Sequence, residues 1–142
     1  ARFARAGGVA YTVELWFKKT GSTTAGAVAR LFNGTVLWRL QATTSADGWQ
    51  ITAGGNSCNF TASTGDWHFL QTVVGTDNVA VTKVDGTTVQ TTGALSAWTG
   101  TPYPILNTST TVSGGDLRID DWRITPGMAR AFAVPTEAFP DS

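Results

Sequence analysis

The chain has 142 residues, no net charge at neutral pH and only 14% charged residues. A nucleic-acid-binding domain would need clustered lysine and arginine, and a disordered chain would be highly charged and poor in apolar residues, so this composition excludes both. No apolar run approaches the ~20 residues that cross a bilayer, so we expect no membrane segment.

Short extended segments separated by turn signals fill the chain. The residues from Tyr11 to Lys18 alternate apolar with polar, Asn33-Gly34 is a hairpin signal, and the segment 67–74 is apolar on both parities, as in a strand at the centre of a sheet. We expect strands over residues 11–18, 28–32, 36–41, 49–53, 67–74, 79–84, 87–91, 105–107 and 117–124. The 24 threonines suit pleated sheets, and turns every ~8–12 residues predict an all-β antiparallel β-sandwich.

The last predicted strand contains two apolar pairs on either side of Asp120–Asp121. Leu117 and Ile119 share one face of an extended chain, whereas Trp122 and Ile124 share the other face. One core cannot take both pairs unless an extra residue changes the phase of the strand. The sequence therefore predicts a β-bulge at Asp120–Asp121.

Four segments, in this order, carry a resemblance to a known family. They are Tyr11–Lys18, the Trp-His strand at Gly65–Phe69, the Val-Asp-Gly turn at Val84–Thr87, and the end of the chain, where an IDD-x-RIT-x-G-x-AR strand and turn from Ile119 to Arg130 leads into a P-x-x-AFP arm from Pro135 to Pro140. Together they resemble the laminin-G-like domains of the concanavalin A-like lectin/glucanase superfamily, in the version found in bacteriophage virion proteins. The resemblance implies a concanavalin A-like jelly roll.

The beginning of the chain departs from this pattern. Such domains open with a strand carrying an F-D-G turn, but Ala1 to Ala10 offers Phe3 and Gly7-Gly8 without an aspartate. Either the opening strand is shortened or the chain is cut from a longer protein. We expect one laminin-G-like domain over residues 1–142, with an extended arm over 131–142.

The resemblance implies a non-enzymatic virion module, either a capsid decoration or a tail or fibre component. Its partners would be other virion proteins, further copies of itself and a cell-surface glycan. The arm would dock through Phe132, Pro135, Phe139 and Pro140. The alternative is a carbohydrate-binding module of a secreted bacterial enzyme or adhesin.

Enzymatic activity is not expected, although the superfamily includes glycan-cleaving enzymes. A glycosidase needs two carboxyl groups ~5.5 Å apart or somewhat more, and no acid pair here has suitable spacing. Glu14 is followed at i+2 and i+4 by Trp16 and Lys18, and Glu137 lies in the closing arm. His68 is the only histidine, and we expect it to be hydrogen-bonded locally on a sheet face rather than to act as a base.

Metal ligands are few. One histidine and one cysteine are too few for zinc. Calcium would take oxygen ligands, and Asp120 or Asp121 could supply one at the bulge. The other interpretation is that these acids accept loop amides or pair with arginines. The missing F-D-G turn favours this second interpretation, and no other cofactor is expected.

The tryptophans divide into core and surface candidates. Trp38, Trp49 and Trp67 share parity with aliphatic neighbours, which predicts core positions. Trp16 lies on the polar face of its strand, and either solvent or the arm could cover it.

Two further aromatic residues lie in predicted loops or edges. Trp98 follows an alanine in a loop, and Tyr103 lies between two prolines. An exposed aromatic ring can stack on a sugar or anchor a protein contact, so Trp98, Trp16 and Tyr103 are the contact candidates.

Overall fold

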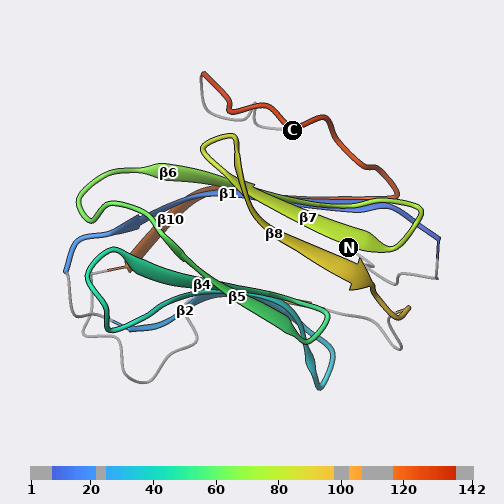
Figure 1. The fold of residues 1–142 in the computed structure, drawn as a ribbon, viewed down its shortest axis with the longest axis horizontal. Helices are drawn as coiled ribbons and strands as arrows, with labels where there is room; N and C mark the ends of the chain where they lie inside the picture. The colour runs from blue at the N-terminus through green and yellow to red at the C-terminus, as the bar shows by residue number, and fades with distance from the viewer. Residues whose placement is uncertain (1–7, 22–24, 98–102, 107–116, 137–142) are drawn as a thin grey trace.

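The computed structural model describes residues 8–21, 25–97, 103–106 and 117–136. Two five-stranded antiparallel sheets pack face to face, with strand orders β10-β1-β6-β7-β8 and β5-β4-β3-β2-β9 (Figure 1). The first sheet consists of β1 (Tyr11–Lys19), β6 (His68–Val74), β7 (Val79–Val84), β8 (Thr87–Ala94) and β10 (Leu117–Pro126). The second consists of β2 (Gly26–Phe32), β3 (Val36–Ala42), β4 (Gly48–Ala53), β5 (Asn56–Thr61) and β9 (Tyr103–Leu106). The described ranges contain no helix able to cross a membrane.

Each of the nine predicted strands overlaps a strand of the structure, and the central position predicted for the segment 67–74 is confirmed by β6. The sequence missed β5, because asparagine and serine are poor strand formers. Only Cys58 and Phe60 of this strand pack against the core. Gly54 and Gly55 turn the chain from β4 directly into β5, which begins at Asn56.

In the core between the sheets Trp38 is completely buried and Trp49 is 1% exposed. Both core predictions are confirmed. The Trp38 Nε1 donates a hydrogen bond to Thr72 Oγ1 at 2.9 Å, and Thr72 Oγ1 lies 2.8 Å from Thr82 Oγ1. Because Trp38 belongs to the second sheet and the threonines to the first, this chain of hydrogen bonds joins the two sheets inside the core.

The core prediction for Trp67 is wrong, since this side chain is 42% exposed. His68 takes the inward position, with its ring 5.6 Å from that of Phe17. Strand residues alternate between faces, so Trp67 points outward, where Lys18 Nζ lies 5.8 Å from its ring centroid.

The predicted bulge in β10 is confirmed. Along β1 the register advances by two residues from Glu14 to Trp16, while β10 moves three residues, from Arg123 to Asp120. Asp121 takes up the extra residue with a φ of 48°. As a result Leu117, Ile119, Trp122 and Ile124 all pack against the core.

The bulge also places Arg123 on the outer face of the first sheet, the face turned away from the second sheet. There Glu14, only 2% exposed, accepts hydrogen bonds from Arg123 Nε and Gln71 Nε2, each at 2.7 Å. The Arg130 Nε lies 3.5 Å from the same carboxylate. A buried carboxylate is therefore compensated from β6, from β10 and from the segment after β10.

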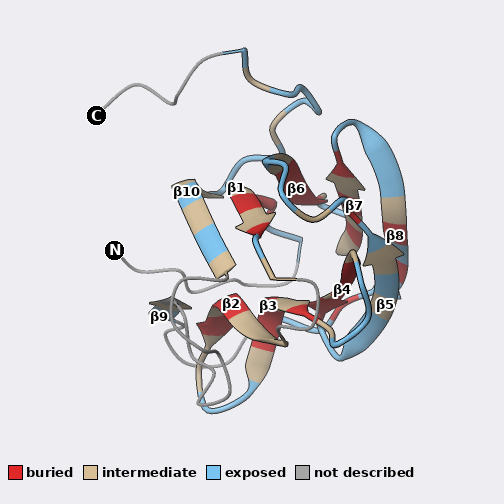
Figure 2. Cartoon of the chain, turned by 90° about the vertical axis from the view of Figure 1, so that its left-hand side faces the viewer, coloured by how far each residue is buried: buried red, intermediate tan, exposed pale blue. Residues whose placement is uncertain are grey.

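The segment 127–136 crosses the outer face of the first sheet (Figures 1 and 2). It contains residues 131–136, the described part of the predicted arm, and from here on the arm means residues 127–136. Thr12 Oγ1 donates to the Met128 carbonyl at 2.8 Å and accepts from the Arg130 amide at 2.9 Å. Gln71 donates to the Ala131 carbonyl at 3.0 Å and accepts from the Ala133 amide at 3.3 Å. Polar side chains of β1 and β6 thus hold the arm by its backbone.

The Trp38 hydrogen bond is testable against Trp49, whose Nε1 is buried without a hydrogen-bond partner among the described residues. Both Trp38→Phe and Trp49→Phe remove the same atoms from the core. We expect Trp38→Phe to lower the free energy of unfolding by at least about 1 kcal/mol more, because only this variant breaks a satisfied hydrogen bond. Urea denaturation measures the difference, and equal losses would contradict a sheet-joining role for the indole.

Candidate functional site

A groove opens between β5 and β8, the edge strands that lie on the same side of the two sheets (Figure 2). Part of the way along, the edges are joined, because Gln90 Nε2 donates to the Asn56 carbonyl at 2.9 Å and Cys58 Sγ contacts the Val89 carbonyl at 3.2 Å. Further along they part around a groove of about 520 Å³. It is lined by Asn59, Phe60, Thr61, Ala62, Ser63, His68, Val84, Asp85, Thr87 and Val89.

The lining of the groove combines an apolar floor with a polar rim. Phe60, Val84 and Val89 pack against the core, and the Phe60 ring meets that of Phe17 edge-on at 6.2 Å. The exposed residues of the lining that carry hydroxyl, amide or carboxylate groups are Asn59, Thr61, Ser63, Asp85 and Thr87, and the Asn59 Oδ1 already accepts a hydrogen bond from Gln50 Nε2 at 3.0 Å. Such a surface offers both contact for an apolar ligand face and hydrogen bonds for its edge.

His68 joins the two walls of the groove. Its Nδ1 lies 2.6 Å from Asp85 Oδ2, and its Nε2 lies 3.0 Å from the Ser63 carbonyl and 3.2 Å from Ser63 Oγ. The other oxygen of Asp85 accepts the Phe69 amide at 2.9 Å. An ionised carboxylate only accepts hydrogen bonds, so the Nδ1 carries the hydrogen of this contact.

Ser63, His68 and Asp85 stand in the order of a nucleophile, a base and an orienting acid. However, Ser63 Oγ donates to Asp66 Oδ2 at 2.7 Å, and a hydroxyl has only one hydrogen to donate. The nearest partner of His68 Nε2 is the Ser63 carbonyl. The expectation of a locally hydrogen-bonded His68 is confirmed, and its bonds fix the shape of the groove.

The wall that carries Ser63 is anchored by Asp47. The Thr64 amide donates to Asp47 Oδ1 at 2.5 Å, and the Ala62 amide donates to the Asp47 carbonyl at 2.9 Å. The hydrogen bond from the Thr64 amide lowers the pKa of the Asp47 carboxyl, and the charges of Lys19 and His68 act in the same direction.

Lys19 supports the same wall from behind. Its carbonyl accepts the Gly65 amide at 2.8 Å, and its Nζ donates to the carbonyls of Thr43 at 2.7 Å and Ser45 at 3.0 Å. The side chain is 1% exposed, and burial lowers the pKa of Lys19 while the charge of Asp47 opposes that change. The buried, hydrogen-bonded Lys19 therefore stabilises this wall of the groove.

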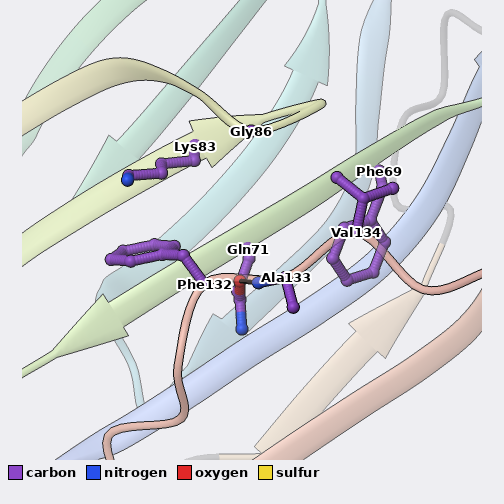
Figure 3. A pocket seen from close by; sticks show the side chains of 7 residues that line it. All are labelled: Phe69, Gln71, Lys83, Gly86, Phe132, Ala133 and Val134. Atoms are coloured by element: carbon purple, nitrogen blue, oxygen red, sulfur yellow. Dashed lines mark hydrogen bonds between the residues drawn. The ribbon is translucent and has the colours of Figure 1, made fainter.

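A second, smaller hollow of about 100 Å³ lies under the arm (Figure 3). Phe132 lies beside Lys83, whose Nζ is 4.3 Å from the ring centroid, and Val134 lies next to Phe69. Of the arm residues named from the sequence, Phe132 and Pro135 are described, whereas Phe139 and Pro140 lie outside the described residues. Phe132 is 36% exposed, so it is available for an external contact.

The three aromatic contact candidates do not gather at one site. Trp16 is half-buried, with its ring 5.2 Å from that of Phe69. Tyr103 is 51% exposed on β9, at the opposite edge of the second sheet from β5, and packs edge-on against Phe32 at 5.9 Å. Trp98 lies outside the described residues. Neither Trp16 nor Tyr103 lines the groove described above.

The acidic pair of the bulge has a local hydrogen-bonding role in the structure. Asp120 Oδ1 accepts the amide of Asp121 at 2.9 Å, which is the local role expected of a bulge carboxylate. Among the described residues, no group of three or more Asp, Glu, His or Cys side chains lies close enough together to hold a metal ion. Calcium also takes backbone carbonyl and water oxygens, so calcium binding at Asp120 or Asp121 stays a prediction.

Sequence reasoning missed the groove because it missed β5, which forms one wall. The opposite wall, at the turn between β7 and β8, could have been predicted from the sequence. The Asp85-Gly86 turn predicted a hairpin between β7 and β8, and antiparallel pairing of β7 with β6 brings Asp85 back to the start of β6. Counting that register would have placed Asp85 beside His68.

No protein-family model and no curated protein matches the chain, but solved structures do. The chain is similar to the binding domain of botulinum neurotoxin serotype D, with a TM-score of 0.69 and 12% identity over 92% of this chain and 35% of that one. It is also similar to a sialidase, with a TM-score of 0.56 and 13% identity over 82% of this chain and 13% of that one. A third similar structure is a SAP-like pentraxin from Limulus polyphemus, with a TM-score of 0.54 and 13% identity over 82% of this chain and 64% of that one.

At these identities the comparisons show the fold. The chain is an all-β, concanavalin A-like jelly-roll sandwich, as predicted. It spans about a third or less of the neurotoxin and sialidase chains that it matches.

The lowered pKa of Asp47 predicts an acid-dependent contribution to stability. When the pKa of an aspartate is lower in the folded state than in the unfolded state, where it is near 3.8, the carboxylate stabilises the fold at pH values above 3.8. This contribution is lost as the pH falls through the pKa of the folded state. Asp47→Asn keeps an oxygen for the Thr64 amide but has no charge. We expect the variant to be less stable than the parent at pH 7 and the difference to shrink below pH 3.8, by urea denaturation. A difference independent of pH would contradict this role.

Proposed function

We propose that the chain is a non-enzymatic binding module whose groove between β5 and β8 takes a glycan. The observation that carries the proposal is the rim of hydroxyl, amide and carboxylate groups around the floor of Phe60, Val84 and Val89. A sugar ring has hydroxyls along its edge and a C–H face that packs on apolar side chains. The groove offers partners for both features.

The absence of catalysis is part of this proposal. The hydroxyl of Ser63 is directed to Asp66, and the next two backbone amides already donate to Asp47 Oδ1 and to the Lys19 carbonyl. Those amides are not free to stabilise an oxyanion, and acyl transfer usually depends on this stabilisation more than on any other effect. The Ser63–His68–Asp85 arrangement therefore supports a structural role for the histidine.

The comparisons agree with a binding role. Solved chains of similar fold include the receptor binding domain of botulinum neurotoxin type G, and also botulinum neurotoxin type C, whose cell entry is described as dependent upon interaction with two ganglioside molecules. These statements concern those proteins. For the present chain they support binding as the function to test first.

A virion setting remains our proposal for where the module acts. Its support is the family resemblance together with the arm, in which Met128, Phe132 and Val134 are 53%, 36% and 42% exposed. Exposed apolar side chains on one segment suit attachment to a neighbouring virion protein. Labelling of purified phage particles by an antibody to the chain tests this setting.

The groove is tested by two matched substitutions on β8. Thr87→Val removes a hydroxyl from the groove rim, and Thr91→Val makes the same change at an exposed position of β8 that does not line the groove. On a glycan array followed by calorimetry, we expect Thr87→Val to weaken binding roughly three- to ten-fold, as for one lost hydrogen bond. Thr91→Val should bind like the parent.

An array that stays silent would refute glycan binding. Equal affinities of the two variants would place the ligand away from the groove.

A further inference from the structure

The ionisable groups around the groove are mostly acidic. Asp85 and His68 line it, and Asp66 contacts the rim residue Ser63. Asp47 anchors the wall at Thr64, and the charge of the buried Lys19 behind the wall acts on Asp47. No lysine or arginine lines the groove as far as the described residues show. A positive charge on His68 would face the Asp85 carboxylate at 2.6 Å, which compensates it.

Asp85 is held ready to accept hydrogen bonds. Each of its oxygens already accepts one donor, from the Phe69 amide and from His68, and a carboxylate offers about four acceptor positions. The side chain is 47% exposed, so the remaining positions face solvent. Two oxygens fixed side by side match two adjacent hydroxyls of a sugar ring.

The carboxylate of Asp66 at the rim opposes a negatively charged ligand. Like charges brought together at an interface reduce affinity, and a site that selects acidic sugars would present the guanidinium fork of an arginine. The groove presents acceptors and neutral hydroxyl and amide groups instead.

We propose that the groove selects uncharged sugars with adjacent hydroxyls and rejects sugars carrying carboxylate, sulfate or phosphate groups. Asp85 accepts the hydroxyl pair, Phe60 packs on the C–H face, and Asp66 adds repulsion at the rim. This inference rests on the proposed function, because it names the class of glycan for the same groove.

The test is a glycan array that contains matched neutral and acidic pairs, such as galactotriose with trigalacturonate and lactose with sialyllactose. We expect every bound glycan to be neutral and its acidic counterpart to bind at least ten-fold more weakly by calorimetry. Acidic glycans bound as tightly as their neutral counterparts would overturn the charge selection and leave the proposed function intact. An array with no binding would overturn the proposed function, and the selection with it.

Two aspartate substitutions show whether the selection arises at the groove. Asp66→Asn removes a charge at the rim and keeps an acceptor for Ser63, and Asp77→Asn removes the same charge in the turn at the other end of β6. We expect Asp66→Asn to reduce the ratio of the affinity for a neutral glycan to the affinity for its acidic counterpart by about two-fold or more in low salt. The effect should be smaller in 0.5 M salt, because salt screens the charge. Asp77→Asn should leave the ratio unchanged. Equal effects of both variants would assign the selection to overall charge and contradict the proposal.

Discussion

The hydrogen bond from Trp38 to Thr72, continued to Thr82, is the interaction on which the sandwich depends. It satisfies the only polar atom of a completely buried indole and joins the two sheets at their centre. With the inner faces committed to this core, ligands and partners are left with the strand edges and the outer faces. The groove is one consequence, since β5 and β8 are joined where Gln90 reaches Asn56 and part beyond that point.

The outer face of the first sheet follows from a second constraint, the change of phase in β10. The extra residue at Asp121 turns Trp122 and Ile124 inward, and the residue between them, Arg123, turns outward to the buried carboxylate of Glu14. Glu14 would be costly to bury without this partner, and its neighbour Gln71 bonds the backbone of the arm. The bulge therefore seats the arm, whose exposed apolar side chains remain outside the core.

Much of the fold was readable from the sequence, and the site was not. Periodicity predicted β1 and the central β6, and the parity change between Ile119 and Trp122 predicted the bulge, because burial of one strand face leaves a pattern of period two. The strand β5 carries that pattern in only two inward side chains, so its polar sequence resembled a loop. The same polarity makes β5 a wall of the groove. Trp67 was assigned to the core because it shares parity with Phe69 and Val73. These two side chains are buried, but outside the core between the sheets, and Phe69 lines the hollow under the arm, so their hydrophobicity did not distinguish the inner face from the outer face.

The central claim is that a sugar occupies the groove between β5 and β8. Titration of the isotopically labelled chain with a glycan that it binds, followed by backbone NMR, tests this most directly. The account predicts that the largest shifts fall on residues 59–63 and 84–89, with little change at Trp16 and Tyr103. Shifts confined to Trp16, to Tyr103 or to the arm would contradict it.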